Sequence, residues 1–148
     1  IPMPMEPFCG MLPADLRYDT HHDMWVRRDG DAVVIGATAF GIHLAGKVIA
    51  FTAKPRGAQV MQGRGLGTIE SAKTVIAVHS PLSFILDAGN EAAEEQPRLI
   101  DSDPYHAGWM ARGRPLDWDR EGALLVDATA YAAHVRTMDP DAQVEVSS

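Results

Sequence analysis

The chain has 148 residues, of which 46% are hydrophobic and 22% are charged, and its formal net charge is −7. A chain of this length and ordinary globular composition forms one domain with a core that needs no disulfide support. The negative net charge disfavours nucleic acid as a partner, and no apolar run is long enough to predict a membrane span. Because Cys9 is the one cysteine, no internal disulfide forms, and we expect a reducing compartment, the cytoplasm.

Most of the chain has the pattern of short strands. Residues 1–17 contain four prolines and no regular period, which predicts a flexible leader, so the domain is expected to span residues 18–139. Asp29-Gly30 suits the positive φ angle of a tight hairpin turn. Short β-branched or aromatic runs that end at Gly, Pro or Asp predict strands. These runs are Met24–Arg28, Asp31–Gly36, Lys47–Ala53, Leu66–Ser71, Lys73–His79, Ser83–Asp87 and Trp109–Arg114.

Three helices are expected, each preceded by a residue that can cap its first turn. The capping residues are Thr38, Asn90 and Asp127. Gly46 and Pro97 are expected to end the first two helices. The third helix carries an apolar stripe that faces the sheets, formed by Tyr131, Val135 and Met138. Residues 140–148 are expected to form a disordered tail.

A short repeat relates two of the expected strands. Val48-Ile49-Ala50-Phe51 returns as Val75-Ile76-Ala77-Val78, and each copy is followed by a proline and then a glycine. Two similar strand units on either side of one turn predict two small sheets, related by an approximate dyad and packed face to face.

The segment between the copies contains a polar tetrad, Glu70-Ser71-Ala72-Lys73, within an otherwise apolar strand pattern. Lys73 is expected at the exposed tip of a hairpin, where its amine is able to form an amide with a carboxylic cofactor. The alternative is an ordinary solvated turn lysine that pairs loosely with Glu70.

Further motifs follow the tetrad in a fixed order. They are Asn90-Glu91-Ala92, Pro97-Arg98-Leu99-Ile100, Asp103–Met110, and Leu124–Ala128 with Tyr131. Together with the tetrad they resemble, over about residues 18–136, the glycine cleavage H-protein family of lipoyl carriers. In that family an acid stands three residues before the lipoylated lysine, as Glu70 does here. Gly57 matches the glycine that the family's lipoylating enzymes read with this acid.

The resemblance implies a fold, a cofactor and partners. The implied fold is mainly β, a hybrid barrel-sandwich of two small antiparallel sheets with short edge helices and a C-terminal helix. Lipoate would be attached to Lys73, and a lipoate ligase or lipoyl transferase would recognise Glu70, Ser71 and Gly57. The protein would be a carrier rather than an enzyme, and dihydrolipoamide dehydrogenase would reoxidise its arm. The residues beside Lys73 are not the methionines usual in biotin carriers, so biotin is less favoured.

Two pathways remain open for such a carrier. In glycine cleavage, the arm takes an aminomethyl group from a pyridoxal-phosphate decarboxylase to a folate-dependent transferase. In sulfur oxidation, H-like lipoate-binding proteins accompany a heterodisulfide-reductase-like complex and carry sulfur intermediates. Gly46-Lys47, the segment Phe51-Thr52-Ala53-Lys54 and leader residues 12–19 depart from the glycine cleavage pattern, so sulfur oxidation is favoured. An unlipoylated binding module is the alternative from another class.

Three other side chains near the N-terminus, those of His21, His22 and Cys9, are able to bind a metal ion or to react. Adjacent His21 and His22 point in different directions, so they are not expected to share a metal ion. The family has a histidine two residues before a tryptophan, where this chain has Asp23 before Trp25. His21 or His22 would therefore have to replace that histidine in holding the loaded arm. Cys9 is interpreted as an incidental thiol.

Overall fold

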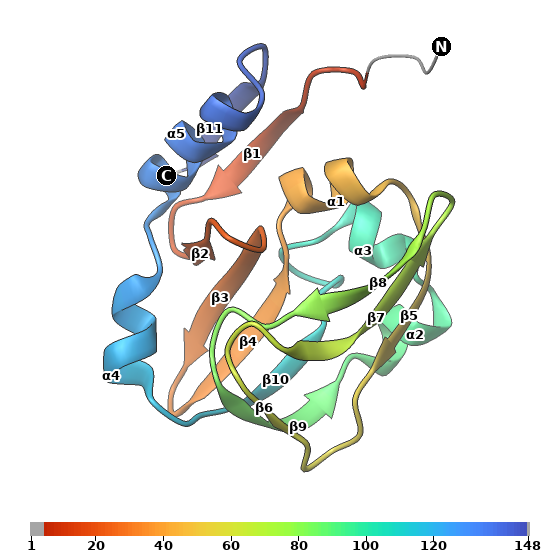
Figure 1. Ribbon diagram of the computed structural model, residues 1–148, viewed down its shortest axis with the longest axis vertical. Helices are drawn as coiled ribbons and strands as arrows, with labels where there is room; N and C mark the ends of the chain where they lie inside the picture. The colour runs from red at the N-terminus through yellow and green to blue at the C-terminus, as the bar shows by residue number, and fades with distance from the viewer. Residues whose placement is uncertain (1–4, 148) are drawn as a thin grey trace.

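The computed structural model describes residues 5–147, which form mainly β-strands (Figure 1). The strands are β1 (Cys9–Pro13), β2 (Arg17–Asp19), β3 (Met24–Asp29), β4 (Ala32–Ala37), β5 (Val48–Ala53), β6 (Gln59–Val60), β7 (Gly65–Ser71), β8 (Val75–His79), β9 (Phe84–Gly89), β10 (Ala111–Pro115) and β11 (Gln143–Ser147). The helices are α1 (Ala39–Ala45), α2 (Glu91–Glu95), α3 (Arg98–Ser102), α4 (Trp118–Glu121) and α5 (Ala128–Met138), with a 3₁₀ turn at Gly122–Leu124. Every predicted strand is present, with ends shifted by two residues or fewer.

Two antiparallel sheets form the body of the protein, and neither closes on itself. Six strands pair in the order β2-β3-β4-β10-β9-β6, and three pair in the order β5-β7-β8. In Figure 1 the smaller sheet lies across the larger one. Inward side chains from both sheets form the main core, among them Val26, Ile35, Phe51, Leu66, Ile69 and Leu86. The mainly β sandwich with short edge helices and a C-terminal helix is confirmed.

The short repeat does not mark two sheets, so that prediction is wrong. Val48–Phe51 lies in β5 and Val75–Val78 lies in β8, and both strands pair with the central strand β7 of one sheet. The two copies differ in register and burial, since Val48 lies beside Ser71 and is buried, whereas Val75 lies beside Glu70 and is 66% exposed. The repeat therefore reflects only that both segments are apolar strands on either side of β7.

The predictions of a flexible leader and of a disordered tail are also wrong for the described residues. β1 and β11 pair in parallel, from Cys9 beside Gln143 to Pro13 beside Ser147. Leu12 is fully buried in a second core beneath α5. Each segment contributes only alternate side chains of one short strand, so neither shows a periodic signal by itself. Residues 1–4 and 148 lie outside the described residues.

Two of the three expected helix caps form. Thr38 and Asp127 each accept a hydrogen bond from the backbone N–H three residues later, at 3.0 and 2.8 Å. Asn90 occupies the N-cap position of α2, but its side chain makes no cap hydrogen bond. Its Nδ2 donates instead to the carbonyls of Ala107 and Trp109, both at 2.8 Å. Asn90 therefore fastens the loop before β10 rather than the helix.

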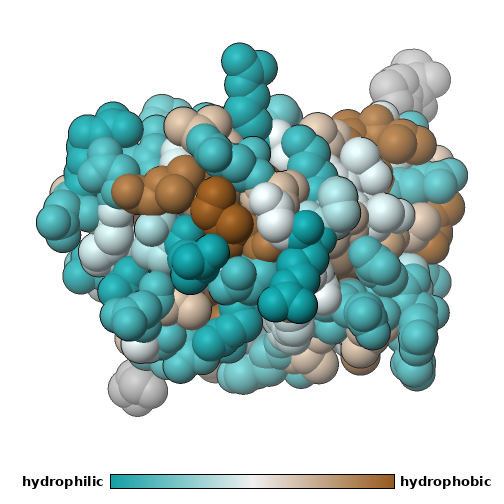
Figure 2. Space-filling model, turned by 90° about the horizontal axis from the view of Figure 1, so that it is seen from below, coloured by the Kyte–Doolittle hydropathy of each residue, from teal (hydrophilic) through white to brown (hydrophobic). Residues whose placement is uncertain are grey.

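The longest helix, α5, covers the second core. Tyr131 and Val135 are fully buried, as the apolar stripe predicts, whereas Met138 is 62% exposed, so the stripe ends one turn early. Within residues 5–147, no helix has both the length and the hydropathy to cross a bilayer. The face seen in Figure 2 is mostly hydrophilic with small hydrophobic areas, in keeping with the net charge of −7.

Candidate functional site

Lys73 lies in the turn between β7 and β8, where the sequence places it. Its side chain is exposed, and in the described part of the chain its amine makes no ion pair or hydrogen bond. The loose pairing with Glu70 that the alternative interpretation predicts is absent among the described residues. The stem of the lysine lies beside the end of α1, where a Cβ at Gly46 would be 3.5 Å from Lys73 Cε. The amine is therefore free while its stem is supported.

Ser71 fixes the turn from which this lysine projects. Its hydroxyl accepts hydrogen bonds from the backbone N–H groups of Lys73 and Thr74, at 3.2 and 3.3 Å. The backbone N–H of Ser71 donates to the Thr74 carbonyl at 2.8 Å. Because Ser71 is buried, these bonds are protected from water. The serine of the tetrad thus holds the backbone of Lys73 while the side chain stays free.

The other two predicted recognition residues lie at different distances from the lysine along the sheet. Glu70 is exposed on β7, next to the turn, with Val75 of β8 paired beside it. Gly57 lies beyond the far end of β5, in a loop with a φ angle of 90°, and its N–H donates to the carbonyl of Leu86. The structure therefore brings Glu70 and Ser71 to Lys73 and leaves Gly57 at the opposite end of the small sheet.

A cleft of about 400 Å³ opens beside Lys73. Its walls come from α1, β8 and the segment that joins β2 to β3. Apolar side chains line most of it, including Met24, Leu44, Ile69, Ile76, Val78 and Met110. His21, His22, Asp23 and His79 supply its polar groups. The sequence did not reveal this cleft, because its walls come from segments distant in the chain.

The histidines lie where this cleft meets a second cavity of about 360 Å³, since His21 and His22 line both. His22 Nδ1 is 2.8 Å from Oδ2 of Asp19, and the rings of His22 and His79 have centroids 5.2 Å apart. His79 Nδ1 donates to the carbonyl of Gly63 at 2.9 Å. Among residues 5–147, no group of three or more His, Cys, Asp or Glu side chains is arranged to hold a metal ion.

Asp23, which stands where the family has a histidine, is tied to two helices. Its φ angle of 57° is left-handed, and its carboxylate accepts a 2.7 Å hydrogen bond from the Tyr131 hydroxyl. That hydroxyl also lies 2.8 Å from Oγ1 of Thr38. Burial raises the pKa of Asp23, and the hydrogen bond from Tyr131 opposes that rise. Burial likewise raises the pKa of Tyr131. This polar chain joins α1 and α5 to the wall of the cleft.

Cys9 is exposed on β1, outside the set of residues that line the cleft. It therefore lies on an ordered strand rather than in a leader, and it lines a separate cavity together with Gly46 and Lys47.

The described residues form a β-sandwich domain that displays Lys73 on a hairpin beside an apolar cleft, an arrangement suited to holding a group attached to that lysine. Comparison with known proteins defines the family more closely. The family described as Glycine cleavage H-protein matches residues 16–138, and the chain belongs to this family.

Individual relatives support this assignment over most of the chain. A glycine cleavage system H protein of Anaeromyxobacter sp. (strain K) is 35% identical over 128 residues, which cover 86% of this chain and 98% of that protein. One of Synechococcus sp. (strain RCC307) is 32% identical, covering 84% and 94% of the two chains. The crystal structure of a glycine cleavage system H protein from Mycobacterium marinum has a TM-score of 0.71 at 29% identity, covering 82% of this chain and 97% of that one. The family resemblance seen in the motifs is confirmed.

Proposed function

We propose that the protein is a lipoyl carrier in which lipoate forms an amide with Nζ of Lys73. The observation that carries this proposal is the free amine of Lys73 on a turn held by Ser71, in a chain that belongs to the H-protein family. When bound, the lipoyl group supplies a ring disulfide that opens to two thiols and holds a transferred group. The chain contributes attachment, reach and docking surface.

The residues around Lys73 fit an arm of this kind. The amine has no competing partner among the described residues, and the adjacent cleft of about 400 Å³ has the size and apolar walls of a small-molecule site. Leu44, Ile76 and Met110 would cover the alkyl part of the arm in the cleft. The exposed turn would present the arm to partner enzymes. Glu70 and Gly57 remain the residues proposed for recognition by a lipoate ligase or lipoyl transferase.

Glycine cleavage is the pathway that the relatives support. They are named as glycine cleavage system H proteins, and they cover most of this chain. The arm would then carry an aminomethyl group between the glycine cleavage enzymes, and dihydrolipoamide dehydrogenase would reoxidise it. The departures that favoured sulfur oxidation include Lys47 and Thr52, both exposed, and exposed positions vary among proteins that share one function.

Sulfur oxidation with a heterodisulfide-reductase-like complex is kept as the second candidate because of one local feature. Lys47 follows Gly46, which lies against the stem of Lys73, so this departure from the glycine cleavage pattern falls at the base of the arm. A partner that docks around the arm would meet this residue. The genes beside this one would separate the pathways, because each places different enzymes in the neighbourhood.

Intact-mass measurement of protein purified from its native host tests the proposal. We expect a mass increase of one lipoyl group, located on Lys73 by peptide mapping and absent from a Lys73→Arg variant. Protein that carries no lipoyl group in actively metabolising cells would leave an unlipoylated binding module as the function. Lipoylated protein is then supplied to purified glycine decarboxylase. Failure to accept an aminomethyl group there would reject glycine cleavage in favour of the second candidate.

A further inference from the structure

Two Asp-x-x-His pairs occur in the chain, and they differ in their surroundings. In the first, His22 Nδ1 lies 2.8 Å from Asp19 Oδ2, with the two side chains 31% and 10% exposed. In the second, His106 Nδ1 lies 3.2 Å from Asp103 Oδ1, with exposures of 76% and 45%. His22 of the first pair lines the cleft that Lys73 also lines, and Asp19 lines the adjoining second cavity, whereas neither residue of the second pair lines either. Ion pairs between exposed side chains contribute little to stability, so the less exposed pair is the candidate for chemistry.

The carboxylate of Asp19 fixes the orientation of the His22 ring. Asp19 Oδ1 accepts a hydrogen bond from the backbone N–H of His21 at 2.9 Å, and the backbone of Asp19 pairs with Met24 in β3. A carboxylate oxygen only accepts, so His22 Nδ1 must carry a proton. In the neutral ring Nε2 is then a free acceptor, and within residues 5–147 no hydrogen bond to it is present. A histidine oriented by an aspartate in this way is the arrangement of a general base.

Other charged or titratable groups lie around the His22 ring, but none of those in the described part of the chain is arranged as a general base oriented by a carboxylate. His79 of β8 donates from Nδ1 to a backbone carbonyl rather than to a carboxylate. Asp23 is engaged by the Tyr131 hydroxyl. His21 contacts Asp19 through its backbone, and Lys73 loses its charge when its amine forms an amide. Of the three histidines that line the cleft, His22 is therefore the one whose ring nitrogen lies within hydrogen-bond distance of a carboxylate.

We infer that His22 Nε2 accepts a proton from a thiol of the reduced lipoyl arm, with Asp19 as the positioning residue. The proton moves from sulfur to Nε2, the sulfur keeps the bonding electron pair, and the charge of the imidazolium is balanced by Asp19. No electron is exchanged, so the step needs no oxidant. The effect is a more nucleophilic sulfur near neutral pH. This inference rests on the proposed attachment of lipoate to Lys73.

The rate of thiol alkylation as a function of pH tests this inference without any assay of the pathway. Cys9→Ser protein is used, because the arm then supplies every thiol. The protein is lipoylated in vitro, checked by intact mass, reduced with a phosphine and treated with iodoacetamide. At pH 7 we expect alkylation roughly five- to tenfold faster than that of free dihydrolipoamide, since about one unit of thiol pKa changes the thiolate population tenfold. His22→Asn should abolish this advantage, and Asp19→Asn should reduce it.

His106→Asn is the matched control, because it breaks the same kind of pair away from the cleft, and its rate should equal that of the parent protein. The inference would be overturned if the alkylation rate of the parent depended on pH in the same way as that of free dihydrolipoamide. This comparison uses only the parent protein, so it does not depend on whether a variant folds. Equal rates for His22→Asn and its parent would also overturn it. Absence of a lipoyl group at the mass check would instead count against the proposed function.

Discussion

Asp23 combines a left-handed backbone with a partly buried carboxylate, and both features affect stability. Burial raises its pKa above the ordinary value of 3.8. Below that value the carboxyl is protonated in both states. As pH rises further, the unfolded chain releases its proton first, so the free energy of unfolding falls until the folded-state pKa is passed.

Asp23→Asn should remove this dependence on pH. Asparagine tolerates positive φ and its Oδ1 still accepts the bond from Tyr131, so the fold is retained. Relative to the parent, the variant should gain stability as pH rises from about 4 to 7, measured by urea unfolding at several pH values. Asp31→Asn, at the exposed turn after β3, is the control, and its free energy of unfolding should change with pH in the same way as that of the parent. If the free energy of unfolding of Asp23→Asn changed with pH in the same way as that of the parent, burial would not raise the pKa of Asp23.

Ser71 holds the backbone of the turn that carries Lys73, and its hydrogen bonds among the described residues do not involve the amine of the lysine. Ser71→Ala removes the acceptor for two backbone N–H groups at the turn, so unfolding should become easier by about 1 kcal/mol. The initial rate of lipoylation should fall as well, because the lysine is then presented on a looser turn. Thr74→Ala is the control, since the Thr74 hydroxyl bonds only the carbonyl of the next residue at 3.5 Å. Unchanged lipoylation of Ser71→Ala would mean that the ligase does not need a fixed turn.

At the scale of elements, the pairing of β1 with β11 joins the two ends of the described chain. Val144 and Val146 lie on the same strand, but Val144 is 8% exposed and packs in the second core, whereas Val146 is 40% exposed. Val144→Ala should lower the free energy of unfolding by about 1 to 2 kcal/mol, and Val146→Ala by less than about 0.5 kcal/mol. Urea unfolding of both variants measures the difference. Equal losses would indicate that the strand does not pack on the core.

The elements that were predictable are those with local signals. The hairpin at Gly30 and the caps at Thr38 and Asp127 depend on neighbouring residues, and the turn at Lys73 follows from the polar tetrad. β1 and β11 were missed because their partner strands are at opposite ends of the chain. The cleft and the bond between Asp19 and His22 were missed for a related reason, because only the folded chain shows which side chains share a cavity.

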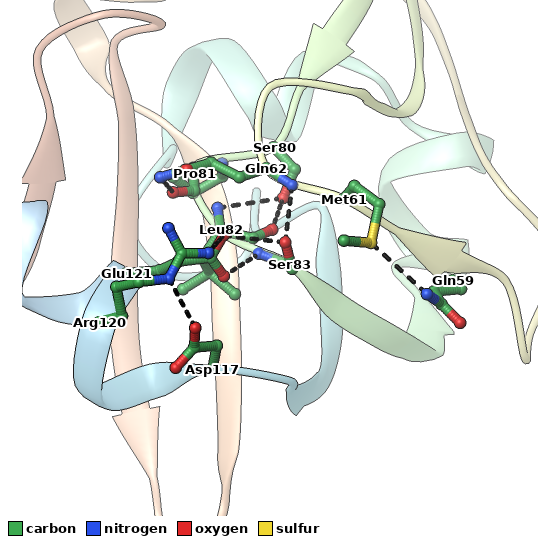
Figure 3. A network of polar contacts seen from close by, with 10 residues as sticks. All are labelled: Gln59, Met61, Gln62, Ser80, Pro81, Leu82, Ser83, Asp117, Arg120 and Glu121. Carbon is green, nitrogen blue, oxygen red and sulfur yellow. Dashed lines mark hydrogen bonds and ion pairs between the residues drawn. The ribbon is translucent and has the colours of Figure 1, made fainter.

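At the scale of the whole molecule, one buried carboxylate links segments from distant parts of the chain. Glu121 in α4 is 2% exposed and accepts hydrogen bonds from the backbone N–H and the hydroxyl of Ser83, at 2.8 and 2.9 Å (Figure 3). Ser83 Oγ accepts in turn from the N–H of Gln62, at 2.9 Å. The loop before β7 and the turn after β8 are thereby fastened to α4. Both segments adjoin the second cavity beside the histidines, which Gln62 and Pro81 line.

Glu121→Ala should therefore lower the free energy of unfolding by about 3 kcal/mol, because it leaves buried donors of Ser83 without acceptors. Glu121→Gln should cost less, since its amide oxygen still accepts one of the two bonds. Asp119→Ala, in the same helix but exposed, should change stability by less than about 0.5 kcal/mol. Urea unfolding gives the three values, and hydrogen exchange of the amides around Ser83 shows whether the turn after β8 opens locally. A loss in Glu121→Ala no larger than in Asp119→Ala would show that the two segments are held by packing alone, because the hydrogen bonds would then contribute no net stability.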